Sequence, residues 1–189
     1  MSASPDPLVA ILQLAYSGER AAAYAYAGHW RSVRREEDRV RIHTIESEEL
    51  KHRQWVGEML TALGQRPDWI REIRASIIGR TLGLLCHVTG WFAPMYGAGR
   101  LERRNICEYE QAARLARDAG HGEFVDCLLT MAEVEWEHEL YFRTCAQSYS
   151  FAKWIHIWPA PPPKDEIRKS FEREGMSSIA TNDSNFLET

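Results

Sequence analysis

A short phrase that can bind metal occurs twice in this sequence, as Glu49-x-x-His52 and as Glu135-x-x-His138. Residues three apart on an α-helix lie on the same face, one turn from each other. A carboxylate oxygen and an imidazole nitrogen placed in this way can reach one metal ion. Two helices of this kind can therefore hold two ions, provided that two further helices each contribute a carboxylate.

Both phrases lie on helix faces that are otherwise apolar. Around the second phrase, residues of one face recur with 4-3-4-3-4-3 spacing: Phe124, Leu128, Met131, Glu135, His138, Phe142 and Cys145. The first phrase has the same rhythm from Ile42 to Leu63. Burying unpaired carboxylates is too costly to be tolerated, so cations must compensate them. Oxygen ligands mixed with imidazole suit iron or manganese better than a closed zinc site.

Glu19 is the candidate carboxylate from the first helical segment. It lies in the middle of an apolar stripe that runs from Leu12 to Tyr26. In an antiparallel hairpin, facing residues lie equally far from the turn. Glu19 and Glu49 are each 15 residues from Arg34, where the first segment passes into the second. We therefore expect these two carboxylates to face each other.

Glu108 is the candidate from the third helical segment, on a weaker stripe between Leu101 and Leu115. Glu108 and Glu135 are centred on the predicted turn between their segments. Glu102 would be centred inside a helix instead, and Glu110 lies off the stripe. Hairpin symmetry thus selects Glu108 as the sixth predicted ligand.

Three other polar residues lie near the predicted ligands. Glu46, one turn before Glu49, is a candidate acceptor for an imidazole N–H group. Tyr16 and Tyr26 share the face of Glu19. We interpret both tyrosines as core residues, with a redox role as the alternative.

Helical periodicity continues through most of the chain, and no stretch alternates with period two long enough to indicate a sheet. Four long helices are predicted, with a connecting region between the second and third; the ranges are 7–34, 36–63, 100–119 and 123–148, with the connection at 68–99. The sequence therefore predicts an all-α, antiparallel four-helix bundle of the ferritin-like kind, with an apolar connecting helical region. We expect residues 1–158 to form this domain and residues 159–189 to form a short, proline-rich and polar C-terminal tail that is loosely held.

Composition narrows the class of protein. The 189 residues suffice for one domain with a real core, and a net charge of -4 gives no basic footprint for nucleic acid. The first residues lack the features of a secretory signal. Four cysteines without a Cys-x-x-Cys pair indicate reduced thiols in a cytoplasmic protein rather than a disulfide framework or a rubredoxin-type iron site.

Several phrases resemble those of one known family. They are Ser17-Gly18-Glu19-Arg20-Ala21-Ala22 followed by Tyr26-Ala27-Gly28, then Arg66-Pro67, Leu82-Gly83 and Gly97-Ala98-Gly99, beside the two Glu-x-x-His phrases. Over roughly residues 12–145 the chain resembles the demethoxyubiquinone hydroxylase family, ferritin-like di-iron enzymes of ubiquinone biosynthesis. The resemblance implies a monooxygenase that uses two iron ions, with manganese as the alternative metal. It also implies dioxygen, an electron donor and an apolar, quinone-like substrate as partners.

The expected ligand set assigns one role to each residue. Glu49 and Glu135 would bridge the two ions, and Glu19 and Glu108 would be terminal ligands. His52 and His138 would each bind one ion. No catalytic residue beyond these ligands is expected.

Other interpretations stay open at this point. The nearly uncharged stretch 81–99 is either a buried helix that caps the bundle or, as the resemblance implies, a segment that leans on the inner face of a membrane. Ferritin- or rubrerythrin-like iron oxidation or peroxide reduction is the alternative function. A homo-oligomer, a helical adaptor without metal and a tRNA-modifying hydroxylase are further options, the last disfavoured by the acidic charge.

Overall fold

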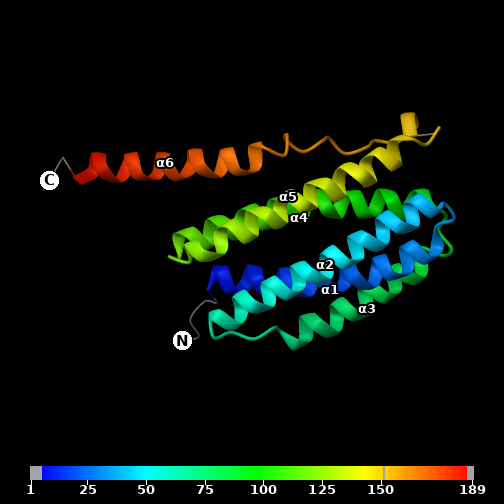
Figure 1. The fold of residues 1–189 in the computed structure, drawn as a ribbon, viewed down its shortest axis with the longest axis horizontal. Helices are drawn as coiled ribbons and strands as arrows, with labels where there is room; N and C mark the ends of the chain where they lie inside the picture. Colours follow the sequence, from blue (N-terminus) through cyan, green and yellow to red (C-terminus); the bar gives the residue numbers. More distant parts are fainter. Residues whose placement is uncertain (1–5, 151, 187–189) are drawn as a thin grey trace.

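The structure is a computed structural model that describes residues 6–150 and 152–186, with side chains as far as residue 176. This part of the chain is helical and contains no strand (Figure 1). The helices are α1 (Pro7–Ser32), α2 (Glu36–Ala62), α3 (Trp69–Leu85), α4 (Phe92–Asp118), α5 (Gly122–Gln147) and α6 (Glu166–Phe186), with a 3₁₀ turn at Ala152–Trp154. The predicted all-α, ferritin-like bundle is confirmed.

Local sequence explains where these helices start and stop. The side chain of Asp6 accepts a hydrogen bond from the Leu8 amide at 2.9 Å, and Asp68 caps α3 in the same way. Gly64 follows α2 and Gly120 follows α4, both with positive φ. Helix α4 begins at Phe92, earlier than the predicted residue 100, because the positive-φ residue that breaks the chain is Gly90.

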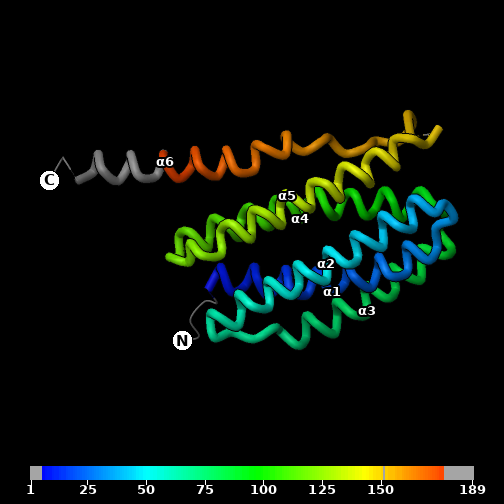
Figure 2. Tube along the Cα trace, viewed as in Figure 1, coloured from blue at the N-terminus to red at the C-terminus, as the bar shows by residue number. Residues whose placement is uncertain are grey.

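Helices α1 and α2 form one hairpin and α4 and α5 form the other, and α3 connects them (Figures 1 and 2). Helix α3 runs back along α1 at very close range. A Cβ atom added at Gly28 would lie 2.4 Å from Gly83, so only glycine permits this approach. The connecting region predicted at 68–99 is thus α3, a turn and the start of α4.

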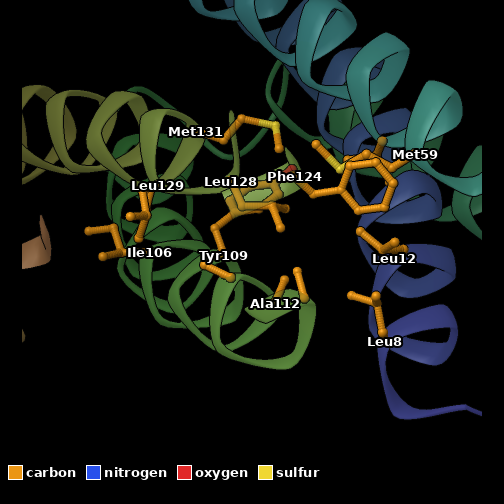
Figure 3. Packing of buried hydrophobic residues seen from close by; sticks show 14 of the residues in the cluster. Leu8, Leu12, Met59, Ile106, Tyr109, Ala112, Phe124, Leu128, Leu129 and Met131 are labelled. Carbon is orange, nitrogen blue, oxygen red and sulfur yellow. The ribbon is translucent and has the colours of Figure 1, made fainter. Parts of the chain in front are cut away.

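The core consists of two apolar clusters with a polar layer between them. One cluster joins α1, α2, α4 and α5 near the start of α1, and Figure 3 shows its side chains, among them Leu12, Met59 and Leu128. The other surrounds Phe142 near the opposite end of the bundle. The ionisable residues of the predicted stripes lie between these clusters, which keep water away from them.

The segment after α5 corrects the expectation of a loosely held tail. Its Trp158 ring is buried against Gly99, and the Trp158 Nε1 atom donates to Glu139 at 2.7 Å. Ile167 joins the apolar core, and Arg168 donates to Glu133 at 2.8 Å. We call residues 158–174 the C-terminal strap, because they run along the outer side of α4 and α5 (Figure 2).

Candidate metal centre

The structure brings five of the six predicted ligands together in the polar layer. Their oxygen and nitrogen atoms fall into two groups of four residues, and within each group these atoms lie within 4.8 Å of one another. The groups are Glu19, Glu49, His52 and Glu135, and Glu49, Glu102, Glu135 and His138. The six different residues of these two groups are all buried, and so is the neighbouring Tyr109. Glu49 and Glu135 belong to both groups.

Glu108 is not brought into either group. Its side chain is partly exposed and pairs with Arg104 at 2.6 Å. Glu102, which is fully buried, stands in the cluster instead. The two residues lie six positions apart, so their side chains point to different sides of α4. The structure therefore brings Glu102, and not Glu108, together with the other five residues.

The prediction of Glu108 assumed that the carboxylate on α4 lies at the same distance from the turn as Glu135 on α5. Glu102 and His138 are each 18 residues from Gly120, so Glu102 is level with His138 and not with Glu135. Ligands of one ion need only reach that ion, and they need not be level across a hairpin. A signal for Glu102 was present in the sequence, because Met95, Gly99, Glu102, Ile106, Tyr109, Ala113 and Ala116 have regular 4-3 spacing. Starting the helix at residue 100 hid the first part of that stripe.

Both histidines turn the Nδ1 atom toward the carboxylates. His52 Nδ1 lies 3.0 Å from Glu135 Oε1, and His138 Nδ1 lies 3.1 Å from Glu49 Oε1. The outer atom of the second ring, His138 Nε2, lies 2.7 Å from Glu48 Oε2. A carboxylate on the outer nitrogen fixes the orientation of a ligating imidazole.

The acceptor for this imidazole is therefore Glu48 and not Glu46. Glu46 accepts a hydrogen bond from Trp30 Nε1 at 2.6 Å. The sequence places Glu46 one turn from Glu49 on the same helix, but the histidine that needs the acceptor is on α5. The spacing of residues within one helix does not reveal a contact between two different helices, such as the one between Glu48 and His138.

Two buried tyrosines connect the halves of the cluster. Tyr26 lies seven residues after Glu19 but donates to Glu102, while Tyr109 lies seven residues after Glu102 but donates to Glu19. Each helix thus holds the carboxylate of the other. Asn105 Nδ2 also donates to Glu102 Oε2 at 2.9 Å. These bonds orient the two outer carboxylates and add positioning residues that the sequence analysis assigned to the core or left out.

The buried groups of the cluster shift one another's pKa values. Burial, together with the charge of Glu135, raises the pKa of Glu49 and Glu102 well above the ordinary value of 4.5. Burial also opposes ionisation of Glu135, but hydrogen bonds from His138 and His52 outweigh it and lower the pKa of Glu135. Burial would lower the pKa of His138, whereas its bonds to Glu135 and Glu48 raise that pKa to about 9.

The donor atoms fit metal ions. Both oxygens of Glu49, Glu135 Oε2 and Glu19 Oε2 are buried without a hydrogen-bond partner among the residues that the structure describes. Burying carboxylate oxygens without a hydrogen-bond partner would destabilise the folded state if nothing else bound them. Hard cations that also accept nitrogen would satisfy all of them, so the cluster can hold metal.

Comparison with known proteins places the chain in a family. The family model described as ubiquinone biosynthesis protein COQ7 matches residues 7–147. The chain belongs to this family. The match covers α1 to α5 and therefore every residue of the two groups, but it does not include the C-terminal strap. No curated protein and no solved structure matches the chain.

The family supports an enzyme, a hydroxylase of ubiquinone biosynthesis, and the buried cluster agrees with a metal-dependent reaction. Within the described residues, no helix is long and apolar enough to cross a membrane.

Proposed function

We propose that this protein is a di-iron monooxygenase that hydroxylates the ring of a quinone-like substrate. The observation that carries this proposal is the sharing of Glu49 and Glu135 between two four-residue groups. Two carboxylates common to two sites are what a pair of neighbouring ions requires. Membership in the ubiquinone biosynthesis family supports a quinone-like substrate.

Each ligand has a separate role in this proposal. Glu49 and Glu135 would help to hold both ions, Glu19 and His52 would complete one site, and Glu102 and His138 would complete the other. Glu102 thereby takes the place that the sequence analysis gave to Glu108. Two iron ions held in this way would supply the activation of dioxygen.

The reaction requires more than the ligands. One oxygen atom enters a C–H bond of the substrate ring, and the other leaves as water, which consumes two electrons and two protons. An external donor must supply the electrons. The two apolar clusters on either side of the polar layer exclude water from the site. Tyr26 and Tyr109 hold Glu102 and Glu19 in place through their hydroxyl groups.

The exposed face of α3 supports delivery of an apolar substrate from a membrane surface. Ile73, Ile77 and Leu84 are more than half exposed on this helix. Arg74 and Arg80 are exposed one turn before and one turn after Ile77, while the acidic Glu72 turns inward to Arg20 and Arg53. An apolar face with positive charges fits the anionic inner surface of a membrane. We therefore propose peripheral contact at α3 and the turn after it, a stretch that begins before the predicted 81–99 and overlaps only its first part.

The experiment that tests this function uses isotopic dioxygen. Iron-loaded protein is reduced and mixed with a methoxy-methyl-benzoquinol and ¹⁸O₂, and the product is analysed by mass spectrometry. We expect one labelled oxygen atom in the ring, and we expect none with Glu135→Ala, which should also lose the iron. A Glu108→Ala variant is the matched control and should keep both properties.

Two results would contradict the proposal. Protein that takes up no iron would remove its basis. Rapid oxidation of ferrous iron without substrate, followed by stored ferric mineral, would favour the ferritin-like alternative instead.

A further inference from the structure

The C-terminal strap meets the α4–α5 hairpin at three successive levels. Its later part contacts the first half of α5, where Arg168 donates to acidic side chains. In the middle, the Trp136 Nε1 atom of α5 donates to the Pro162 carbonyl oxygen at 2.8 Å. Trp158, where the strap begins, contacts the hairpin further from its turn than these two bonds. The strap is thus anchored along much of the hairpin, and its anchors lie at different distances from the metal centre.

Trp158 lies at the level of the second group of proposed ligands. Gly99, against which its ring packs, comes one turn before Glu102 on α4. Glu139, to which its Nε1 atom donates at 2.7 Å, directly follows His138 on α5. The indole therefore sits outside the hairpin beside the backbone of two proposed ligands, one on each helix.

The Trp158 ring fits closely into the hairpin. It is 8% exposed, and a Cβ atom added at Gly99 would overlap it. The same added atom would lie 3.0 Å from the Cβ atom of Phe142, so the indole and Phe142 meet at this glycine. Phe142 stacks on Tyr26 with ring centroids 5.6 Å apart, and Tyr26 donates to Glu102. Because packed interiors transmit displacements, a shift of the indole would reach Glu102 through these groups.

The hydrogen bond from Trp158 acts on α5. Glu139 is fully buried, and its Oε1 atom accepts from Trp158 and also from Arg143 Nε at 2.9 Å. Its Oε2 atom has no hydrogen-bond partner among the described residues. A buried carboxylate is costly unless donors hold it, so loss of the indole N–H would draw Glu139 toward another donor. Since Glu139 follows His138 in the chain, this movement would shift the backbone that aims the imidazole.

We propose that Trp158 is a positioning residue for one of the two metal sites, the site completed by Glu102 and His138, which we call the second site. This inference rests on the metal centre of the proposed function and extends it to a residue beyond the matched range 7–147. The first site is completed by residues of α1 and α2 instead. Loss of the Trp158 contacts should therefore weaken the second site and spare the first.

Two substitutions remove the two halves of the contact separately. Trp158→Phe keeps an aromatic ring and removes the N–H donor. Gly99→Ala keeps the donor and displaces the ring, although alanine is by itself more favourable than glycine inside a helix. Ile167→Ala is the matched control, because Ile167 also anchors the strap but belongs to the apolar cluster near the start of α1.

Ferrous iron is titrated anaerobically into metal-free protein, and the melting temperature is measured alongside. We expect wild-type protein to bind one ion at each site. Trp158→Phe and Gly99→Ala should each weaken one binding step by about tenfold and leave the other within about twofold. Ile167→Ala should lower the melting temperature but leave both steps within about twofold.

Single-site backgrounds identify the step that is affected. Glu19 and Glu102 each belong to only one of the two groups, so Glu19→Ala should keep the second site and Glu102→Ala the first. Adding Trp158→Phe should weaken iron binding by about tenfold in Glu19→Ala and by less than about twofold in Glu102→Ala. A general loss of stability would weaken both backgrounds alike, so this difference separates positioning from a purely structural role.

Other results would overturn the inference. Equal weakening of both binding steps by Trp158→Phe would reduce the strap to a structural cover. Unchanged iron binding in Trp158→Phe and Gly99→Ala, while wild-type protein still loads both sites, would reject the role of Trp158 and leave the proposed function standing. Wild-type protein that takes up no iron would reject both. Should Trp158→Phe fail to fold, Gly99→Ala decides by the same criterion.

Discussion

The two hairpins of the bundle carry the same chemistry but have different outer covers. Helices α1 and α2 supply Glu19 and one Glu-x-x-His phrase, and α4 and α5 supply Glu102 and the other. Outside the first hairpin lies α3, whose outer face is largely apolar and exposed. Outside the second lies the C-terminal strap, which is anchored by Trp158 and Ile167 and by ion pairs. The polar layer is thus built alike from both hairpins, but their covers differ, because α3 leaves apolar side chains exposed and the strap buries its own.

This contrast predicts opposite roles for apolar residues in the two covers. Ile167 is 3% exposed and Ile77 is 61% exposed. Ile167→Ala should lower the free energy of unfolding by about 2–4 kcal/mol, because it leaves a cavity in a packed core. Ile77→Ala should change it by less than about 0.5 kcal/mol and should instead weaken binding to anionic vesicles. Chemical denaturation and vesicle sedimentation measure the two effects.

Equal stability losses in the two variants would show that α3 and the strap are both structural covers. Loss of vesicle binding in Ile167→Ala alone would reverse the assignment of the two faces.

The hairpins also differ one residue before each Glu-x-x-His phrase. Glu48 holds the outer nitrogen of His138, but the equivalent position in the other phrase is Val134, which offers no acceptor. Glu48→Gln should weaken one of the two metal sites by about 10–100-fold and leave the other nearly unchanged. Titration of metal-free protein with ferrous iron under anaerobic conditions separates the two sites. Equal weakening of both, or of neither, would contradict an individual role for Glu48.

The two shared carboxylates differ in protonation, which predicts a pH dependence. In the metal-free protein burial raises the pKa of Glu49, while hydrogen bonds from both histidines lower the pKa of Glu135 against the effect of its burial. Glu49, Glu102 and His138 therefore retain protons in the folded state that the unfolded chain releases. Since the folded state binds more protons, stability should fall as pH rises from about 5 to 9, by roughly 1 kcal/mol per pH unit for each retained proton.

Denaturation of metal-free protein across this pH range checks the sign. Iron-loaded protein should not show the same decline, because metal replaces the protons and binds more tightly as pH rises. Metal-free protein that becomes more stable from pH 6 to 8 would contradict the assigned protonation of the cluster.

Much of the bundle could be predicted from sequence because the predicted ligands on α1, α2 and α5 lie on regular apolar stripes. The sixth position could not be fixed by hairpin symmetry, because Glu102 is level with His138 and not with Glu135. A glycine-containing stretch also hid the first turns of α4, where Met95 and Gly99 begin its stripe.

The C-terminal strap was missed for a different reason. Its prolines and charges are typical of a free tail, and only its tertiary contacts distinguish it. Trp158 fits the space that Gly99 leaves, and Arg168 reaches acidic residues on α5 that are distant in sequence. Pairings of this kind depend on the fold and cannot be read from local pattern.

The most direct test of the metal centre compares Glu102→Ala with Glu108→Ala. Iron is measured per chain after anaerobic loading and removal of unbound metal. We predict about two ions in wild-type protein and in Glu108→Ala, and at most about one in Glu102→Ala, because Glu102 belongs to only one of the two groups. Full loading of Glu102→Ala together with loss of iron in Glu108→Ala would contradict the centre as the structure places it.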